Sequence, residues 1–525
     1  MLRWFRMFFN PRPATRTAVS RTGHGQTGTP LTSDIRRNVE MVKNSFGDSA
    51  DIVVREMPGT SANTPSMALI HIDGLVCQEL VAEVLLARIA DHQDEWRDPR
   101  QAFQALKGRV VSVSQVRETT VLEELVEQLC AGGCAILVES YPEALLCEVR
   151  GWPHRAIEEP ITEPTVRGPK EGFSETLRTN TSLLRRRIKS SDLRIEQIKI
   201  GRITRTDVAV VYIATVVNQK VLGEVRRRLS KIDVDSIQES GHLEELIEDS
   251  HWSPFPTILR TERPDKAVGN LLEGRVVIIT DGTPFVLIVP ATLTMFLSAP
   301  EDYFERFLIG TLLRIVRFTA FLLSFTLSSL YVAVTTFHQE MLPTNLLWAI
   351  ASQREGIPFP TVVEVLIMEA IFEVLREAGI RLPPVVGQTV SIIGVLVLGD
   401  AATRAGLASP ATIVVLAASG VSSFAAPTFS IGIAARMLRF IMILLGGTMG
   451  LFGIISGLFT LFLHLTTLRS FGMPYLTPYS PFIASDMKDA AFRAPWWATR
   501  KRPALLSDRN PTRSSRRLKA TFHRS

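Results

Sequence analysis

The pattern of apolar and polar positions divides the chain into two parts near residue 306. Before this point, short apolar runs alternate with segments in which apolar residues recur every three or four positions. After it, charges become sparse up to residue 470 and uncharged apolar runs reach about 20 residues, enough to span a hydrocarbon core of about 30 Å. The pattern predicts a mixed fold, in which a soluble α/β N-terminal region precedes a polytopic α-helical membrane domain.

The soluble region is predicted to form two α/β subdomains. Residues 33–152 contain strand-like runs separated by segments of helical period. Residues 153–170 are rich in proline, which interrupts helices and sheets, and therefore mark a linker. Residues 171–305 show the same alternation and include a continuous apolar strand at 208–216.

The membrane domain, residues 306–470, is predicted to contain about four spanning helices. They are residues 318–337, 385–404, 411–430 and 440–463. Arginines precede the first span and Glu340 follows it, so the positive-inside rule places the N-terminal region in the cytoplasm. An even number of crossings then leaves the C-terminal tail on the same side.

Residues 361–378 form a long helical segment that is too charged to face lipid all round. Its acidic residues include Glu364, Glu369 and Glu373. Each charge at the membrane centre costs about 2.5–3.5 kcal/mol, whereas a large apolar residue returns only about 0.3–0.6 kcal/mol. We therefore expect either a cation-attracting vestibule or pore wall, or an amphipathic interfacial helix in which Glu373 pairs with Arg376.

Glycines recur at spacings of four residues in the last predicted span. The two pairs are Gly446 with Gly450, and Gly453 with Gly457. Small residues at this spacing allow helix backbones to approach closely in lipid, so these glycines are candidates for helix packing. The same spacing also arises by chance in a glycine-rich helix.

Basic residues concentrate at the two ends of a chain whose net charge is +6. Residues 1–32 contain no acidic residue and are rich in proline, glycine and threonine, which predicts a disordered basic tail. Residues 471–525 are predicted to form a basic cytoplasmic tail. Beside a membrane domain the expected partner of both tails is anionic lipid rather than nucleic acid, although solvated tails without a partner would have the same composition.

No arrangement typical of catalysis is found in the sequence. It contains no phosphate-binding P-loop, no HExxH or GxSxG motif and no cysteine pair with zinc-ligand spacing. A GxGxxG pattern at 23–28 has no strand before it. We therefore predict no catalytic, cofactor-binding or metal-binding residues, and the four cysteines are expected to be free thiols.

Several short motifs follow one another in a specific order between residues 170 and 482. They include EGFSE at 171–175, TERPD at 261–265, LEGR at 272–275, DGTPF at 281–285 and LREAG at 375–379. With these motifs and the acidic helix before LREAG, the chain resembles the A subunits of bacterial spore germinant receptors, the GerA family. It equally resembles their A-like paralogue from the spoVA locus.

The resemblance implies a place and a role. Such A subunits lie in the inner membrane of the endospore and act with a transporter-like B subunit and a lipoprotein C subunit. They are thought to form homo-oligomeric, ligand-gated cation channels that trigger germination. The alternative is a membrane-anchored scaffold or accessory ion-release protein without nutrient sensing. Neither role is enzymatic.

Overall fold

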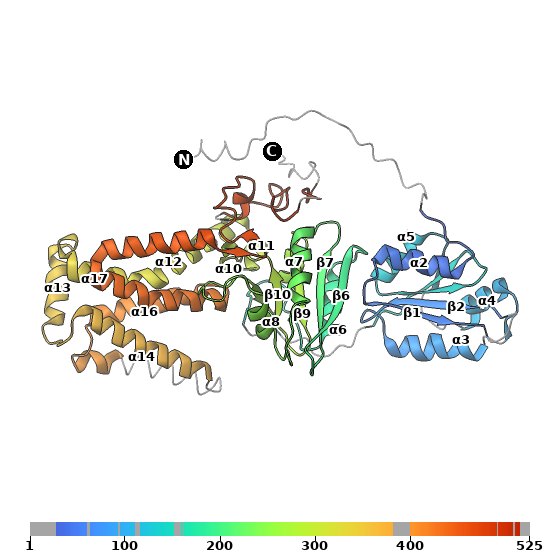
Figure 1. Cartoon of the computed structure of the whole chain (residues 1–525), viewed down its shortest axis with the longest axis horizontal. Coiled ribbons are helices and arrows are strands. Elements are labelled where there is room, and N and C mark those ends of the chain that lie inside the picture. Colours follow the sequence, from blue (N-terminus) through green and yellow to red (C-terminus); the bar gives the residue numbers. More distant parts are fainter. Residues whose placement is uncertain are drawn as a thin grey trace, which may run out of the picture.

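Two antiparallel sheets and a bundle of long helices make up the protein (Figure 1). This architecture confirms the predicted fold class, with two α/β subdomains followed by a helical part. The computed structural model describes residues 28–59, 64–92, 95–110, 116–151, 159–160, 162–381, 399–490, 492–507 and 510–514. Most of the predicted tail at 1–32 and most of the predicted span 385–404 lie outside these ranges.

The first subdomain is a five-stranded sheet in the order β1-β2-β4-β5-β3. Its strands are β1 (Ile52–Met57), β2 (Met67–Ile72), β3 (Val116–Thr119), β4 (Cys134–Val138) and β5 (Ala144–Cys147). One face is covered by α2 (Ile35–Phe46) and α5 (Leu122–Cys130), and the other by η1 (Leu80–Leu86), α3 (Ala87–His92), α4 (Pro99–Ala105) and η3 (Leu106–Val110). Because both faces are covered, β2, β4 and β5 are buried along their whole length and are apolar except for His71 in β2.

The second subdomain has a five-stranded sheet in the order β6-β7-β9-β10-β8. Its strands are β6 (Leu193–Ile200), β7 (Thr206–Ile213), β8 (Leu259–Thr261), β9 (Val276–Thr280) and β10 (Val286–Val289). One face packs against α7 (Gln219–Leu229) and α8 (Ser240–Ile247), and the other against α6 (Leu177–Arg187) and α9 (Pro264–Leu271). The core on the α6–α9 face continues into the helical part, where it includes Phe325 and Ala434.

The helical part begins after two short helices that follow the second sheet. The two short helices are α10 (Leu293–Leu297) and α11 (Glu301–Phe304). The helical part consists of α12 (Phe307–Phe337), η4 (Gln339–Met341), α13 (Thr344–Arg354), α14 (Thr361–Arg381), α16 (Pro410–Phe424) and α17 (Phe429–Thr467). Among the described residues, α12 and α17 are the two helices long and apolar enough to cross a membrane. Figure 1 shows the long helices running along the long axis of the molecule, with α13 at the end farthest from the sheets.

The helix bounds differ from the predicted spans in three places. α12 starts at Phe307, earlier than the predicted 318, because the basic residues before the apolar run continue the helix. The acidic helix α14 extends beyond 378 to Arg381. The predicted span 411–430 is divided between α16 and the start of α17, because the helix ends at Phe424 before a proline-containing turn.

The long helix α17 reverses direction at Gly450, which adopts φ 61° and ψ −142°. A Cβ atom added to Gly457 would lie 2.8 Å from the sulfur atom of Met442. A straight helix would separate these two residues by about 22 Å. The predicted span 440–463 therefore contains the reversal of a helical hairpin and is not one straight helix.

The C-terminal segment folds back onto the second subdomain. After the short strands β11 (Arg469–Ser470) and β12 (Met473–Pro474), it continues through η5 (Asp486–Asp489). The Nε atom of Arg502 donates to the carbonyl of Leu272 at 2.8 Å, and the Asn218 amide donates to the carbonyl of Leu505 at 3.1 Å. The region predicted as a basic tail therefore packs against the second subdomain through its described residues.

A buried ion pair joins the two subdomains. The guanidinium of Arg185 in α6 contacts Asp51 of the first subdomain at 2.7 Å, and their side chains are 2% and 9% exposed. The guanidinium of Arg185 also donates a hydrogen bond to the hydroxyl of Ser49 at 3.0 Å. Arg178, on the same helix, pairs with Asp73 of the first subdomain at 2.9 Å, but its side chain is 71% exposed.

Replacing Arg185 with Met should lower the free energy of unfolding by about 3–5 kcal/mol, because Asp51 would be left buried without its cation. The matched change Arg178→Met should cost no more than about 1 kcal/mol, because water screens that pair. Thermal unfolding of the purified protein, followed by near-UV circular dichroism, measures both. Equal losses in the two variants would contradict this assignment.

Candidate functional site

A buried ion pair lies at the centre of the helical domain. Glu369 of α14 and Arg439 of α17 are each 2% exposed, and the guanidinium donates to the carboxylate at 2.9 Å. The hydroxyl of Ser328 in α12 donates to the second carboxylate oxygen at 3.0 Å. Arg439 also donates to the carbonyl of Ser324 at 2.7 Å. One charge pair therefore fixes the mutual positions of α12, α14 and α17.

Glu364 lies near the far end of the bundle and is fully buried. One carboxylate oxygen accepts from the backbone amide of Ser409, the N-cap residue of α16, at 2.7 Å. The other faces the guanidinium of Arg354 at 3.8 Å, and within the described part of the chain it has no hydrogen-bond donor. The start of α16 and the nearby arginine together compensate this charge.

Glu373, on the side of α14 nearer the sheets, pairs with Arg436 of α17. The expected pair of Glu373 with Arg376 is not formed. Arg376 instead donates to the hydroxyl of Ser423 at 3.0 Å and lies over the ring of Phe424 at 4.7 Å. Glu369 and Glu373 are thus compensated by arginines of α17, whereas Glu377 pairs with Arg381 within α14.

The four glycines singled out in the sequence lie at close approaches within one chain. A Cβ atom on Gly446 would lie 2.7 Å from the carbonyl oxygen of Ser329 in α12. Gly453 and Gly457 bring the returning arm of α17 against the outgoing arm, around Leu445. Gly450 forms the reversal itself, and a Cβ atom on it would lie 2.8 Å from the ring of His338. A side chain at Gly446 or Gly453 would meet backbone carbonyls and push the helices apart.

The partners of the acids were not identified from the sequence. Arg436 and Arg439 are spaced three residues apart, so they lie on one face of α17 and face α14. Two arginines at helical spacing next to an apolar run were the available signal.

A second charge cluster lies where α12 leaves the second subdomain. The side chains of Arg314 and Asp302 are fully buried and 3.2 Å apart, and Arg317 approaches the same carboxylate at 2.7 Å. Arg314 also donates to the carbonyl of Asp489 in the C-terminal segment at 2.8 Å. Burial raises the pKa of Asp489, and Arg314 opposes this rise. The cluster fastens α12, α11 and the C-terminal segment together.

Metal-binding chemistry is not indicated within the ranges that the structure describes. No three His, Cys, Asp or Glu side chains gather there in a way that could hold an ion. Cys77 is partly buried and Cys130, Cys134 and Cys147 are buried, all as free thiols. The ion pairs of the helical domain are therefore the candidate functional site.

The sequence matches a known family over most of its length. The family described as Bacillus/Clostridium GerA spore germination protein matches residues 40–505. The chain belongs to the GerA family. The resemblance carried by the short motifs is thereby confirmed, and the match includes both sheets, the helical domain and the folded C-terminal segment.

Two curated relatives of this GerA-family protein cover nearly the whole chain. Spore germination protein KA of Bacillus subtilis is 45% identical over 486 residues, which cover 93% of this chain and 89% of the relative. The B. subtilis protein named uncharacterized membrane protein YfkQ is 41% identical over 488 residues, with 93% and 94% covered. A solved structure, the N-terminal domain of the A subunit of the Bacillus megaterium spore germinant receptor GerK3, is 36% identical. It covers 51% of this chain and 99% of its own, with a TM-score of 0.42.

The central pair predicts a large effect on stability. Glu369→Gln should lower the free energy of unfolding by about 3–5 kcal/mol, because Arg439 would remain buried without its anion. The double variant Glu369→Met with Arg439→Met should recover most of this loss, because two apolar side chains replace two desolvated charges. Thermal unfolding in detergent measures both.

The control for this pair lies on the same helix. Glu377→Gln removes an exposed acid whose partner is Arg381, so it should change stability by less than about 1 kcal/mol. A double variant no more stable than Glu369→Gln alone would show that the pair is not the source of the effect.

Gly450 is predicted to tolerate no side chain. Gly450→Ala should destabilise the protein by about 1–3 kcal/mol, because its φ of 61° is unfavourable for an L residue and a Cβ would meet His338. Gly432→Ala in the outgoing arm is the matched change, since a Cβ there would meet only an ordinary contact at 3.8 Å. It should stabilise the helix by about 0.5–1 kcal/mol. Equal thermal midpoints for the two variants would rule out a strained reversal.

Proposed function

We propose that this chain is the membrane subunit of a nutrient germinant receptor, and that it triggers spore germination as an oligomeric, ligand-gated cation channel. Membership of a family of spore germination proteins supports the role in germination. The channel is supported by one observation above all. Glu364, Glu369 and Glu373 follow one another along α14, and the first two are buried inside the helical bundle.

Burying acidic side chains in such a bundle costs free energy, which suggests that they are kept for a function. The effective penalty of desolvating one charge is several kcal/mol, and apolar residues would pack there at lower cost. In the described conformation Arg439 and Arg436 of α17 pair with the carboxylates of Glu369 and Glu373. We therefore interpret it as a closed state, in which a displacement of α17 along α14 would free the carboxylates for a monovalent cation.

The proposed location is the inner membrane of the endospore, as a multi-pass protein. α12 and both arms of α17 supply three apolar spans, the shorter apolar helix α16 would supply the fourth, and the relative YfkQ is named a membrane protein. Both ends of the hairpin return to the sheets, so an even number of crossings would leave the N- and C-termini on the core side. The basic residues of both tails would then lie near anionic headgroups.

The proposed partners are a transporter-like B subunit, a lipoprotein C subunit and further copies of this chain; nucleic acid is not among them. The returning arm of α17 exposes a row of large apolar side chains at helical spacing. They are Phe452, Ile455, Phe459 and Phe462, each more than half exposed. Such a row fits either lipid or the helix of a second copy, which is what an oligomeric channel requires.

The second candidate function is a membrane-anchored scaffold or accessory protein for ion release. The same ion pairs also support this function, because paired acids can have a purely structural role. Each of the three acids already has an arginine or a backbone amide as partner within one chain. In a scaffold these pairs would only fix the helices relative to one another, and they would never open.

Two substitutions with opposite expected effects separate these functions. Glu373→Gln should slow the nutrient-triggered release of monovalent cations from spores several-fold, because it removes a carboxylate from the proposed path. Arg436→Gln should raise release without nutrient, because Glu373 would then lack its competing cation. A potassium-selective electrode measures the release, and immunoblots of the membrane fraction verify that protein levels are unchanged. If both variants release cations as the parent protein does, or change in the same direction, the channel proposal fails.

A further inference from the structure

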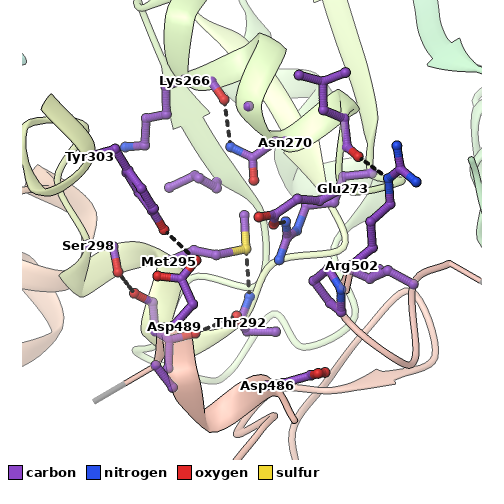
Figure 2. Close-up of a pocket in the computed structure, with 18 of the residues that line it drawn as sticks. Lys266, Asn270, Glu273, Thr292, Met295, Ser298, Tyr303, Asp486, Asp489 and Arg502 are labelled. Carbon is purple, nitrogen blue, oxygen red and sulfur yellow. Dashed lines mark hydrogen bonds and ion pairs between the residues drawn. The ribbon is translucent and has the colours of Figure 1, made fainter. Parts of the chain in front are cut away.

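A cavity of about 630 Å³ lies where the second subdomain, the helices leading to α12 and the C-terminal segment meet (Figure 2). α9 contributes Asn270, while the segment through α10 and α11 contributes Met295 and Tyr303. The C-terminal segment closes the remaining side, with Trp496 and Arg502 among its residues. None of the acids of the proposed ion path lines this cavity.

The walls of the cavity suit a small molecule with an apolar body. Met295, Tyr303 and Asn270 converge on the central space in Figure 2. Phe304 and Trp496 add further aromatic surface. The volume falls within the range of about 300–1,000 Å³ typical of ligand sites. Asn270 donates its amide nitrogen to the carbonyl of Lys266 at 2.7 Å, and its amide oxygen faces the cavity.

One side of the cavity carries more positive than negative charge. Arg275 and Arg513 both bind the carboxylate of Glu273, the latter at 2.9 Å. Arg502 binds carbonyl groups, including that of Asn510 at 2.9 Å. Arg275 is 5% exposed, and its buried Nε atom has no hydrogen-bond acceptor within the described ranges. Burial lowers the pKa of Arg502, and the nearby charge of Arg513 lowers it further.

The other charged residues of the lining do not balance this excess. Lys266 pairs with Glu163 at 2.7 Å, and Asp489 pairs with Arg314 at 3.2 Å. Asp265 pairs with Arg263 in the same way. Asp486, which accepts from the amide of Ala504 at 2.8 Å, is the one further acid of the lining. Three guanidinium groups thus face two carboxylates.

From this geometry we infer that the cavity binds a small, water-soluble carboxylate with an apolar or aromatic body. The ligand's carboxylate would lie beside Arg275 and Arg502, and its body would lie against Tyr303 and Trp496. Binding would join the C-terminal segment more firmly to α9 and α11. This inference does not depend on ion conduction, because binding can be measured whether or not the protein is a channel.

The wall of the cavity connects directly to the helical domain. The hydroxyl of Tyr303 donates to Asp489 at 2.9 Å, and the carbonyl of Asp489 accepts from Arg314 at the start of α12. An occupant that displaces Tyr303 would therefore act on the cluster that fastens α12. The site has the position expected of one that regulates the helices from the soluble side.

The test uses the full chain in nanodiscs with 3-phenylpropionate as the probe and 3-phenylpropanol as its uncharged counterpart. Isothermal titration should show saturable binding of the acid, with the alcohol at least about tenfold weaker. Gly269 lines the cavity in the middle of α9, and a Cβ there would meet nothing within 4 Å. Gly269→Leu should therefore fill the cavity without a clash and abolish binding.

The matched control is Gly223→Leu, another helical glycine with open space around its Cβ but outside the cavity. It should bind the acid as the parent protein does. Arg502→Gln should weaken binding of the acid by about tenfold while leaving binding of the alcohol unchanged. The inference is overturned if neither probe binds, if acid and alcohol bind equally, or if Gly269→Leu and Gly223→Leu bind the acid equally well.

Discussion

The cost of removing charges from water governs the arrangement of the helical domain. Glu364 and Glu369 are buried and Glu373 is partly buried along one helix, and each meets an arginine or an amide there. Those partners lie on other helices, so the requirement for compensation fixes the positions of α12, α16 and α17 around α14. Apolar packing alone is non-directional and would leave the rotation of each helix about its axis less strictly defined.

The same constraint recurs where one part of the molecule joins another. A buried guanidinium lies at each junction: Arg185 between the two subdomains, and Arg314 between the second subdomain and the helical domain. Around these pairs, the core of the second sheet continues into the helical domain through Phe296 and Phe325. The sheets and helices are consequently coupled by both ion pairs and apolar packing, so a displacement of one part would be transmitted to the next.

Local patterns in the sequence predicted what is local in the structure. Continuous apolar strands and the acidic helix follow from the nearest few residues, and both could be recognised. The reversal at Gly450 could not, because glycines at a spacing of four look the same in a straight helix and in a hairpin. The partners of Glu369 and Glu373 come from a segment more than 60 residues away. The many arginines of the C-terminal segment predict a solvated tail, whereas in the structure Arg502 binds a distant carbonyl group.

The hairpin of α17 has a mechanical consequence. Its first end is tied to the second subdomain by the Thr428 hydroxyl, which donates to the carbonyl of Phe296 at 2.9 Å. Its last turn is tied by a hydrogen bond of 2.9 Å between His464 and Ser253. Both ends of the hairpin are thus held by segments that flank the second sheet, α10 and the loop before β8, which restricts sliding of one arm past the other. A rotation of the sheet therefore displaces the whole hairpin as a lever, and moves its arginines relative to the glutamates without unwinding a helix.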